Sequence, residues 1–109
     1  MREGLIKAVE SMVREELQAS MEKFPLFHSA HEGFAIILEE VIELHEELED
    51  SGKIHNSIQR LWSMVRNNSN YKDTAINQIE QHAINAACEA IQVAAMCRKF
   101  KESEKRWQK

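Results

Sequence analysis

Glutamates crowd one stretch of this 109-residue sequence. Residues 31–50 hold eight acidic residues and no lysine or arginine. Within the stretch, Glu40, Glu43 and Glu47 are spaced at i, i+3 and i+7, which places them on one side of a helix. Like charges at this spacing repel, and no cation of the stretch neutralises them. Clustered carboxylate oxygens suit hard cations such as Mg²⁺, so the pattern favours half of a divalent-metal site over a solvated acidic face.

A second polar stripe interrupts the most apolar part of the chain. Residues 83–97 contain six alanines, and their strongly polar members are Asn85, Glu89 and Gln92. On a helix these three occupy a sector of about 60°, and His82 lies beside them one turn earlier. A carboxylate buried there must be paired, protonated or metal-bound. A buried hydrogen-bond network or an oligomer contact is the alternative, but the acidic stretch favours a shared metal site between two helices.

Four helices should position these residues. Apolar periodicity predicts them at about residues 3–22, 31–50, 53–68 and 73–104. Pro25 should end the first, Ser29 and Glu32 form a capping box for the second, and Ser51-Gly52 is its expected stop. The turn between the last two helices falls at residues 67–70.

Burial is predicted from the same periodicity. Residues 83–97 are apolar nearly all round and should be central to the bundle. The basic residues 101–109 read as a solvated helix end that frays. The expected apolar face of the second helix consists of Phe34, Ile37, Leu38, Val41, Ile42, Leu44 and Leu48.

Composition limits the class of protein. With 43% hydrophobic residues, three Gly and one Pro, residues 1–109 are expected to form one all-α antiparallel bundle, which oligomerisation would complete. The net charge of −4 argues against nucleic-acid binding. The chain shows no signal peptide and no run of apolar residues that could span a bilayer, so a cytoplasmic protein is expected. Cys88 and Cys97 match no zinc motif and are expected to pack as small hydrophobes.

Two short motifs resemble a known family. Glu39-Glu40-Val41-Ile42-Glu43 and Glu89-Ala90-Ile91-Gln92 are similar to the E-E-x-x-E and E-x-x-D motifs of MazG-like all-α nucleoside triphosphate pyrophosphohydrolases, in their small virus-type or bacterial branch. The resemblance covers roughly residues 22–100. It implies a Mg²⁺-dependent hydrolase, with Mn²⁺ as a substitute, that cleaves a nucleoside triphosphate between the α and β phosphates. It also implies a homodimer or homotetramer.

The resemblance assigns roles to individual residues. Glu40, Glu43 and Glu89 match its metal-binding positions, and Glu39 would position the attacking water as the catalytic residue. Gln92 stands where the family has an aspartate, which lowers the ligand charge. Glu47, one turn beyond Glu43, is the acid that would compensate, and the Gln92 carbonyl oxygen would complete the set.

The nucleotide contacts are less sharply defined by the sequence. The cations considered for the phosphates are Lys23, Lys53, Arg98 and Lys99. The base is expected in an apolar pocket near the loop from Phe24 to His31, where Phe24, Phe27 and His28 could stack.

A non-catalytic helical interaction module is the competing hypothesis. Gln92 favours it, as does His45 on the expected apolar face of the second helix. Trp62 and Trp107 would then be oligomer contacts, because interfaces are enriched in aromatic residues.

Overall fold

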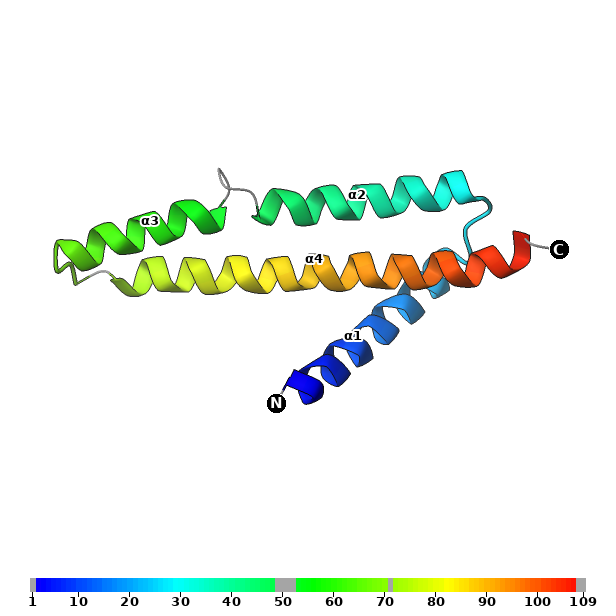
Figure 1. Ribbon diagram of the computed structural model, residues 1–109, viewed down its shortest axis with the longest axis horizontal. Coiled ribbons are helices and arrows are strands. Elements are labelled where there is room, and N and C mark those ends of the chain that lie inside the picture. Colours follow the sequence, from blue (N-terminus) through cyan, green and yellow to red (C-terminus); the bar gives the residue numbers. More distant parts are fainter. Residues whose placement is uncertain (1, 49–52, 71, 108–109) are drawn as a thin grey trace. The chain divides into compact units, whose positions relative to one another are not determined.

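The computed structural model describes residues 2–48, 53–70 and 72–107, and in these ranges the chain is helical without any strand. The helices are α1 (Arg2–Lys23), α2 (Ala30–Leu48), α3 (Lys53–Arg66) and α4 (Lys72–Trp107) (Figure 1). The all-α prediction is therefore confirmed. The expected stop at Ser51-Gly52 lies outside the described residues. Within the described ranges, no helix has the length and apolar character needed to cross a membrane.

Helix ends follow local signals in the sequence. α1 stops at Lys23, two residues before Pro25, whose ring disfavours a helical residue ahead of it. At the start of α2, the Ser29 Oγ accepts a hydrogen bond from the Glu32 backbone N–H at 3.1 Å, as expected for an N-cap. Asn68 takes a left-handed φ of 53° just after α3, a conformation that asparagine tolerates.

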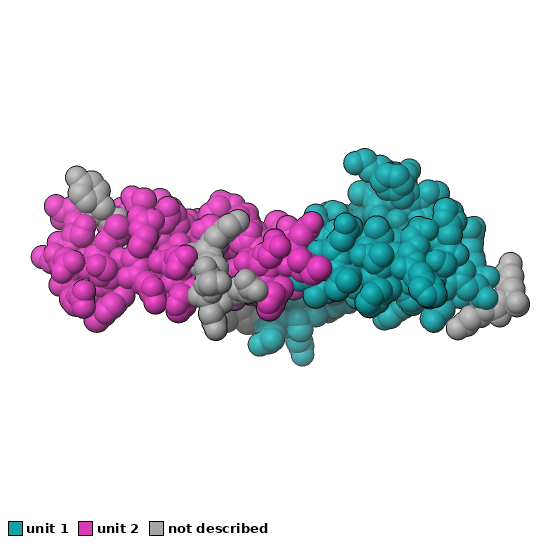
Figure 2. Space-filling view, turned by 90° about the horizontal axis from the view of Figure 1, so that it is seen from above, with its two compact units in different colours: residues 1–41, 90–109 teal, residues 42–89 magenta. Residues whose placement is uncertain are grey.

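The chain divides into two compact units, coloured separately in Figure 2. The first comprises residues 1–41 and 90–109, and the second comprises residues 42–89. The boundary crosses α2 and α4, so each of these helices contributes a segment to both units.

The first unit has a small apolar core. Val13, Phe27, Ala95 and Met96 are buried together. Gly33 marks a close approach beside them, because a Cβ there would lie 2.6 Å from the Cδ2 atom of Phe100. Other apolar side chains of the unit, half-buried, pack against this core: Leu17, Ile36, Ile37, Ile91, Ala94, Phe100 and Trp107.

The C-terminal end of α4 differs from the frayed tail that the sequence predicts. The helix continues to Trp107, whose ring packs edge-on against Phe100 with the centroids 5.4 Å apart. The Trp107 Nε1–H donates to the Phe27 carbonyl oxygen at 3.2 Å. Ser103, 0% exposed, accepts a hydrogen bond from the Phe27 N–H at 2.9 Å and donates to the Lys99 carbonyl oxygen at 2.8 Å. Trp107 therefore packs against the rest of its own chain. Even in its basic last turns, α4 has one side that contacts the core of the first unit.

The second unit contains part of α2, all of α3 and the first half of α4. The Arg60 guanidinium donates a hydrogen bond to the Gln78 side-chain oxygen, which joins α3 to α4. Its fully buried positions are small, with Ser57 4% and Ala75 0% exposed. Large apolar residues of the unit remain exposed instead: Ile42, Leu48, Ile58, Trp62, Val65, Ile76 and Ile84.

Two of the burial predictions are wrong. On α2, Phe34 is 63% exposed, and the expected apolar residues Leu38, Val41, Ile42 and Leu48 are exposed as well. Residues 83–97 do not form a fully buried central helix, since Ile84, Cys88 and Cys97 are exposed. In the described part of the chain, other residues cover each of these two segments on one side only. Helical periodicity shows which side chains are apolar, but it does not show which of them another segment covers.

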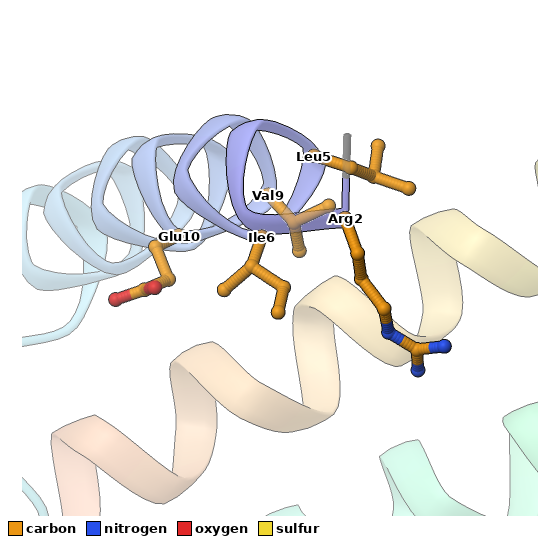
Figure 3. Close-up of a pocket in the computed structure, with 5 residues that line it drawn as sticks. All are labelled: Arg2, Leu5, Ile6, Val9 and Glu10. Carbon is orange, nitrogen blue, oxygen red and sulfur yellow. The ribbon is translucent and has the colours of Figure 1, made fainter.

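The first turns of α1 form a further exposed apolar surface. Leu5 is 65% exposed, and with Ile6 and Val9 it lines a hollow of about 710 Å³ (Figure 3). Arg2 and Glu10 lie at its two ends and carry opposite charges.

Candidate metal centre

Three carboxylates, those of Glu40, Glu43 and Glu89, lie close together. Glu40 and Glu43 are one turn apart on α2, and Glu89 lies on α4. A carboxylate oxygen of Glu43 lies within 4.8 Å of one from Glu40 and of one from Glu89. Glu40 and Glu89 are half-buried and Glu43 is exposed. We call these three residues the acidic cluster.

The spacing of these oxygens suits one small cation. Two oxygens bound to the same Mg²⁺ at about 2.1 Å are at most about 4.2 Å apart, and for Ca²⁺ the limit is near 4.8 Å. A small change of side-chain rotamer would therefore bring the cluster onto a single ion. Exposed acidic groups are common without a metal, so the spacing alone permits such a site without requiring it.

The charge state of Glu89 reflects its surroundings. Burial raises the pKa of Glu89 above the ordinary range of a glutamate, and a hydrogen bond with Glu43 and the negative charges of Glu43 and Glu47 raise it further. Glu89 ionises more readily when positive charge lies nearby. A proton and a cation therefore compete for the same carboxylates.

Glu47 occupies a different position from the acidic cluster. Its Oε2 atom lies 3.9 Å from the Nδ1 atom of His82 on α4, and both atoms are buried. Glu47 nevertheless acts electrostatically on Glu89. The sequence placed His82 on the Glu89 stripe but did not predict that it would face Glu47.

Glu39 and Gln92 differ in their exposure and in their position relative to the acidic cluster. Glu39 is exposed on α2, and it is not one of the three clustered carboxylates. Gln92 is half-buried and lines a cavity of about 280 Å³ together with Glu40, Lys23 and Phe24. The residue that replaces the expected aspartate thus shares a cavity with one member of the acidic cluster.

Of the four basic residues considered for the phosphates, those whose side chains the structure describes lie in different environments. Lys23 is exposed and shares the 280 Å³ cavity with Glu40. Arg98 forms an ion pair with Glu10 at 3.8 Å. Lys99 is buried, and the side chain of Lys53 lies outside the described residues. Among the candidate cations whose side chains the structure describes, Lys23 is the one that shares a cavity with an acidic-cluster residue.

The three residues expected to stack on the base, Phe24, Phe27 and His28, all line one cavity of about 370 Å³ but differ in exposure. Phe24 is 72% exposed and also lines the 280 Å³ cavity. Phe27 is buried in the core but also lines the larger cavity, while His28 is exposed at its edge. His45 and Trp62 are exposed on the second unit.

Comparisons with known proteins add no relative. No family model, no curated protein and no solved structure matches this chain.

Proposed function

We propose that this protein is a Mg²⁺-dependent nucleoside triphosphate pyrophosphohydrolase, also served by Mn²⁺, that acts in the cytoplasm. It would cleave between the α and β phosphates and release a nucleoside monophosphate and pyrophosphate. The observation that carries the proposal is the acidic cluster, with carboxylate oxygens within 4.8 Å of one another. The raised pKa of Glu89 supports it, because a cation would relieve the repulsion that holds that proton.

Each side chain then has a defined task. Glu40, Glu43 and Glu89 would hold the metal, which would supply charge stabilisation to the phosphate group when bound. Glu47 adds negative charge behind them, and Glu39 orients the attacking water. Lys23, in the cavity that contains Glu40, offers a cation to the phosphates.

A product assay tests the proposal directly. The purified full chain is incubated with each of the common ribo- and deoxyribonucleoside triphosphates, with Mg²⁺, Mn²⁺ or EDTA. We expect equal amounts of pyrophosphate and nucleoside monophosphate from at least one nucleotide with either metal, and none with EDTA. Release of inorganic phosphate in place of pyrophosphate, or no hydrolysis across the panel, would overturn the proposal.

An interaction module is the second candidate function. The exposed apolar residues at the start of α1, Leu5, Ile6 and Val9, favour it, because a contiguous apolar surface on a small protein marks a contact with another chain. A folded, self-associating chain that hydrolyses no nucleotide would support this candidate instead.

Self-association is part of both candidates. A second copy, as a homodimer or within a homotetramer, would cover the apolar surface of α1. Antiparallel pairing of two α1 helices about Ile6 places Arg2 opposite Glu10 of the other copy, so the surface complements itself in charge.

Sedimentation velocity can locate this contact. Ile6→Asp places a charge in the α1 surface and should shift the protein towards the monomer. Ala8→Asp makes the same kind of change on another side of α1 and should leave the oligomer intact. Equal sedimentation of Ile6→Asp and wild type would show that α1 is not the contact.

A further inference from the structure

Three side chains on one side of α4 hold the loop that follows α1. Lys99, Ser103 and Trp107 are spaced at i, i+4 and i+8, which places them on the same side of the helix. The Phe27 N–H donates to the Ser103 Oγ at 2.9 Å, and the Trp107 Nε1–H donates to the Phe27 carbonyl oxygen at 3.2 Å. Both backbone polar groups of Phe27 are therefore bonded to α4. We call Lys99, Ser103 and Trp107 the α4 clamp.

The Lys99 ammonium holds the start of the same loop. It donates to the Phe24 carbonyl oxygen at 2.6 Å and to the Ser20 Oγ at 3.0 Å. The Phe24 N–H donates to the Ser20 carbonyl oxygen at 2.8 Å, so the Phe24 carbonyl lies at the end of α1, where the carbonyls of a helix lack partners within it. A cation at this end also complements the helix dipole. Lys99 therefore caps α1 from a position 75 residues away.

Burying the Lys99 ammonium costs free energy. The residue is 2% exposed, and burial lowers its pKa, although the charge of Glu32 acts in the opposite direction. Two hydrogen bonds and the Phe27 ring, whose centre lies 4.9 Å from the Nζ, compensate in part for the lost water. An apolar side chain of similar length would fill the same space without this cost. What the ammonium adds is a fixed position for the Phe24 carbonyl.

Phe24 is the aromatic residue of the loop that a ligand can reach. It is 72% exposed and lines the 280 Å³ cavity together with Glu40 and Lys23. Phe27, in contrast, is 5% exposed and belongs to the core. Every nucleotide base has a face that stacks on an aromatic ring, and a ring held in place beforehand binds more tightly than a mobile one. The base of a nucleotide whose phosphates lie towards Lys23 and Glu40 would therefore stack on Phe24.

We propose that the α4 clamp positions Phe24 for nucleotide binding, with Lys99 as the positioning residue that fixes the Phe24 backbone and so holds the ring against the base. The inference rests on the proposed function and adds to it residues that contact no substrate. Ser103 and Trp107 hold the far end of the same loop. Because the α4 clamp acts through Phe24, its side chains should affect nucleotide affinity only while the Phe24 ring is present.

A double-mutant cycle measured by calorimetry tests this role. The probes are the 5′-monophosphates of adenosine, guanosine, cytidine and uridine with Mg²⁺, which the proposed reaction does not consume. We expect Phe24→Ala and Lys99→Met each to bind about tenfold more weakly than wild type, the value of one stacked base. The double variant should bind no more weakly than Phe24→Ala alone. Additive losses in the double variant, wild-type affinity in Lys99→Met, or no binding of any probe to the wild type would overturn the inference.

Matched variants separate the α4 clamp from general effects of mutation. Lys101→Met changes an exposed lysine two residues beyond Lys99 and should bind the probes as the wild type does. Trp107→Phe keeps a ring against Phe100 but removes the donor to the Phe27 carbonyl, so it should weaken binding about threefold. This mild change tests the α4 clamp even where Lys99→Met fails to fold. A loss of the same size when Trp107→Phe is combined with Phe24→Ala would contradict action through the Phe24 ring.

Steady-state kinetics tell failure of this inference from failure of the proposed function. Lys99→Met should raise KM about tenfold and leave kcat within about twofold of wild type, because the acidic cluster is unchanged and only binding is weakened. Pyrophosphate release with an unchanged KM in Lys99→Met would keep the hydrolase and overturn the positioning role. Nucleotide binding that depends on Lys99 through Phe24, without pyrophosphate release, would keep the positioning role and overturn the hydrolase.

Discussion

Glu43→Gln should lower Mg²⁺-dependent pyrophosphate release at least about 100-fold, because a direct ligand matters more than the outer-shell groups whose loss costs 10- to 100-fold. The same variant should raise the melting temperature of the metal-free protein. Glu43 repels Glu40 and Glu89, and the uncharged amide removes that repulsion while keeping the shape of the side chain. Opposite effects on activity and stability distinguish a metal site from a structural contact.

Two matched variants serve as controls. Glu46→Gln changes an exposed glutamate of α2 that is not part of the acidic cluster, and should alter neither property appreciably. Glu39→Gln should lower the rate while leaving Mg²⁺ affinity unchanged, since Glu39 is assigned to the water and not to the metal. Hydrolysis by Glu43→Gln at the wild-type rate would remove the acidic cluster from the mechanism.

The pH dependence of stability follows from Glu89. Its pKa is raised in the folded chain, so between about pH 4.3, the ordinary value for glutamate, and that raised pKa, the folded state binds more protons than the unfolded state. Without metal, this group's contribution to stability therefore falls as the pH rises through that window. Glu43→Gln should reduce the fall, because Glu43 is one of the groups that raise the pKa. Urea unfolding in EDTA across this range measures the effect.

The second large effect concerns Ser103. Ser103→Ala should lower the free energy of unfolding by about 2 kcal/mol, because the Phe27 N–H loses its acceptor inside the protein. The Lys99 carbonyl loses its hydroxyl donor at the same time. Alanine is a better helix former than serine, so the measured loss already includes a small opposing gain.

Ser11→Ala is the matched control for Ser103→Ala. Ser11 also lies inside a helix but is only half-buried, and its replacement should change stability by less than about 0.5 kcal/mol. Urea unfolding of both variants measures the difference. Equal free energies of unfolding for Ser103→Ala and Ser11→Ala would show that water accepts the hydrogen bond of the Phe27 N–H. Ser103 would then not hold the end of α4 in place.

The sequence by itself determined the four helices and several of their ends. Pro25, the Ser29 cap and the turn at Asn68 act through bonds within a few residues, so their effects can be read from local sequence. The spacing that puts Glu40 and Glu43 on one side of α2 is likewise a property of any helix. The acidic stripe and the position of Glu89 were therefore predictable in advance.

Only the tertiary structure decided which faces are covered and which side chains meet. The residues expected at the C-terminus as a frayed tail are held by Ser103 and Trp107, which contact a loop about 76 to 80 residues earlier in the chain. Lys99 appeared to be one surface cation among several, yet it is buried with partners 75 and 79 residues away. Periodicity reports which side of a helix a residue occupies, but burial depends on segments distant in sequence. For that reason the glutamates could be identified from the sequence, whereas the burial of Lys99 could not.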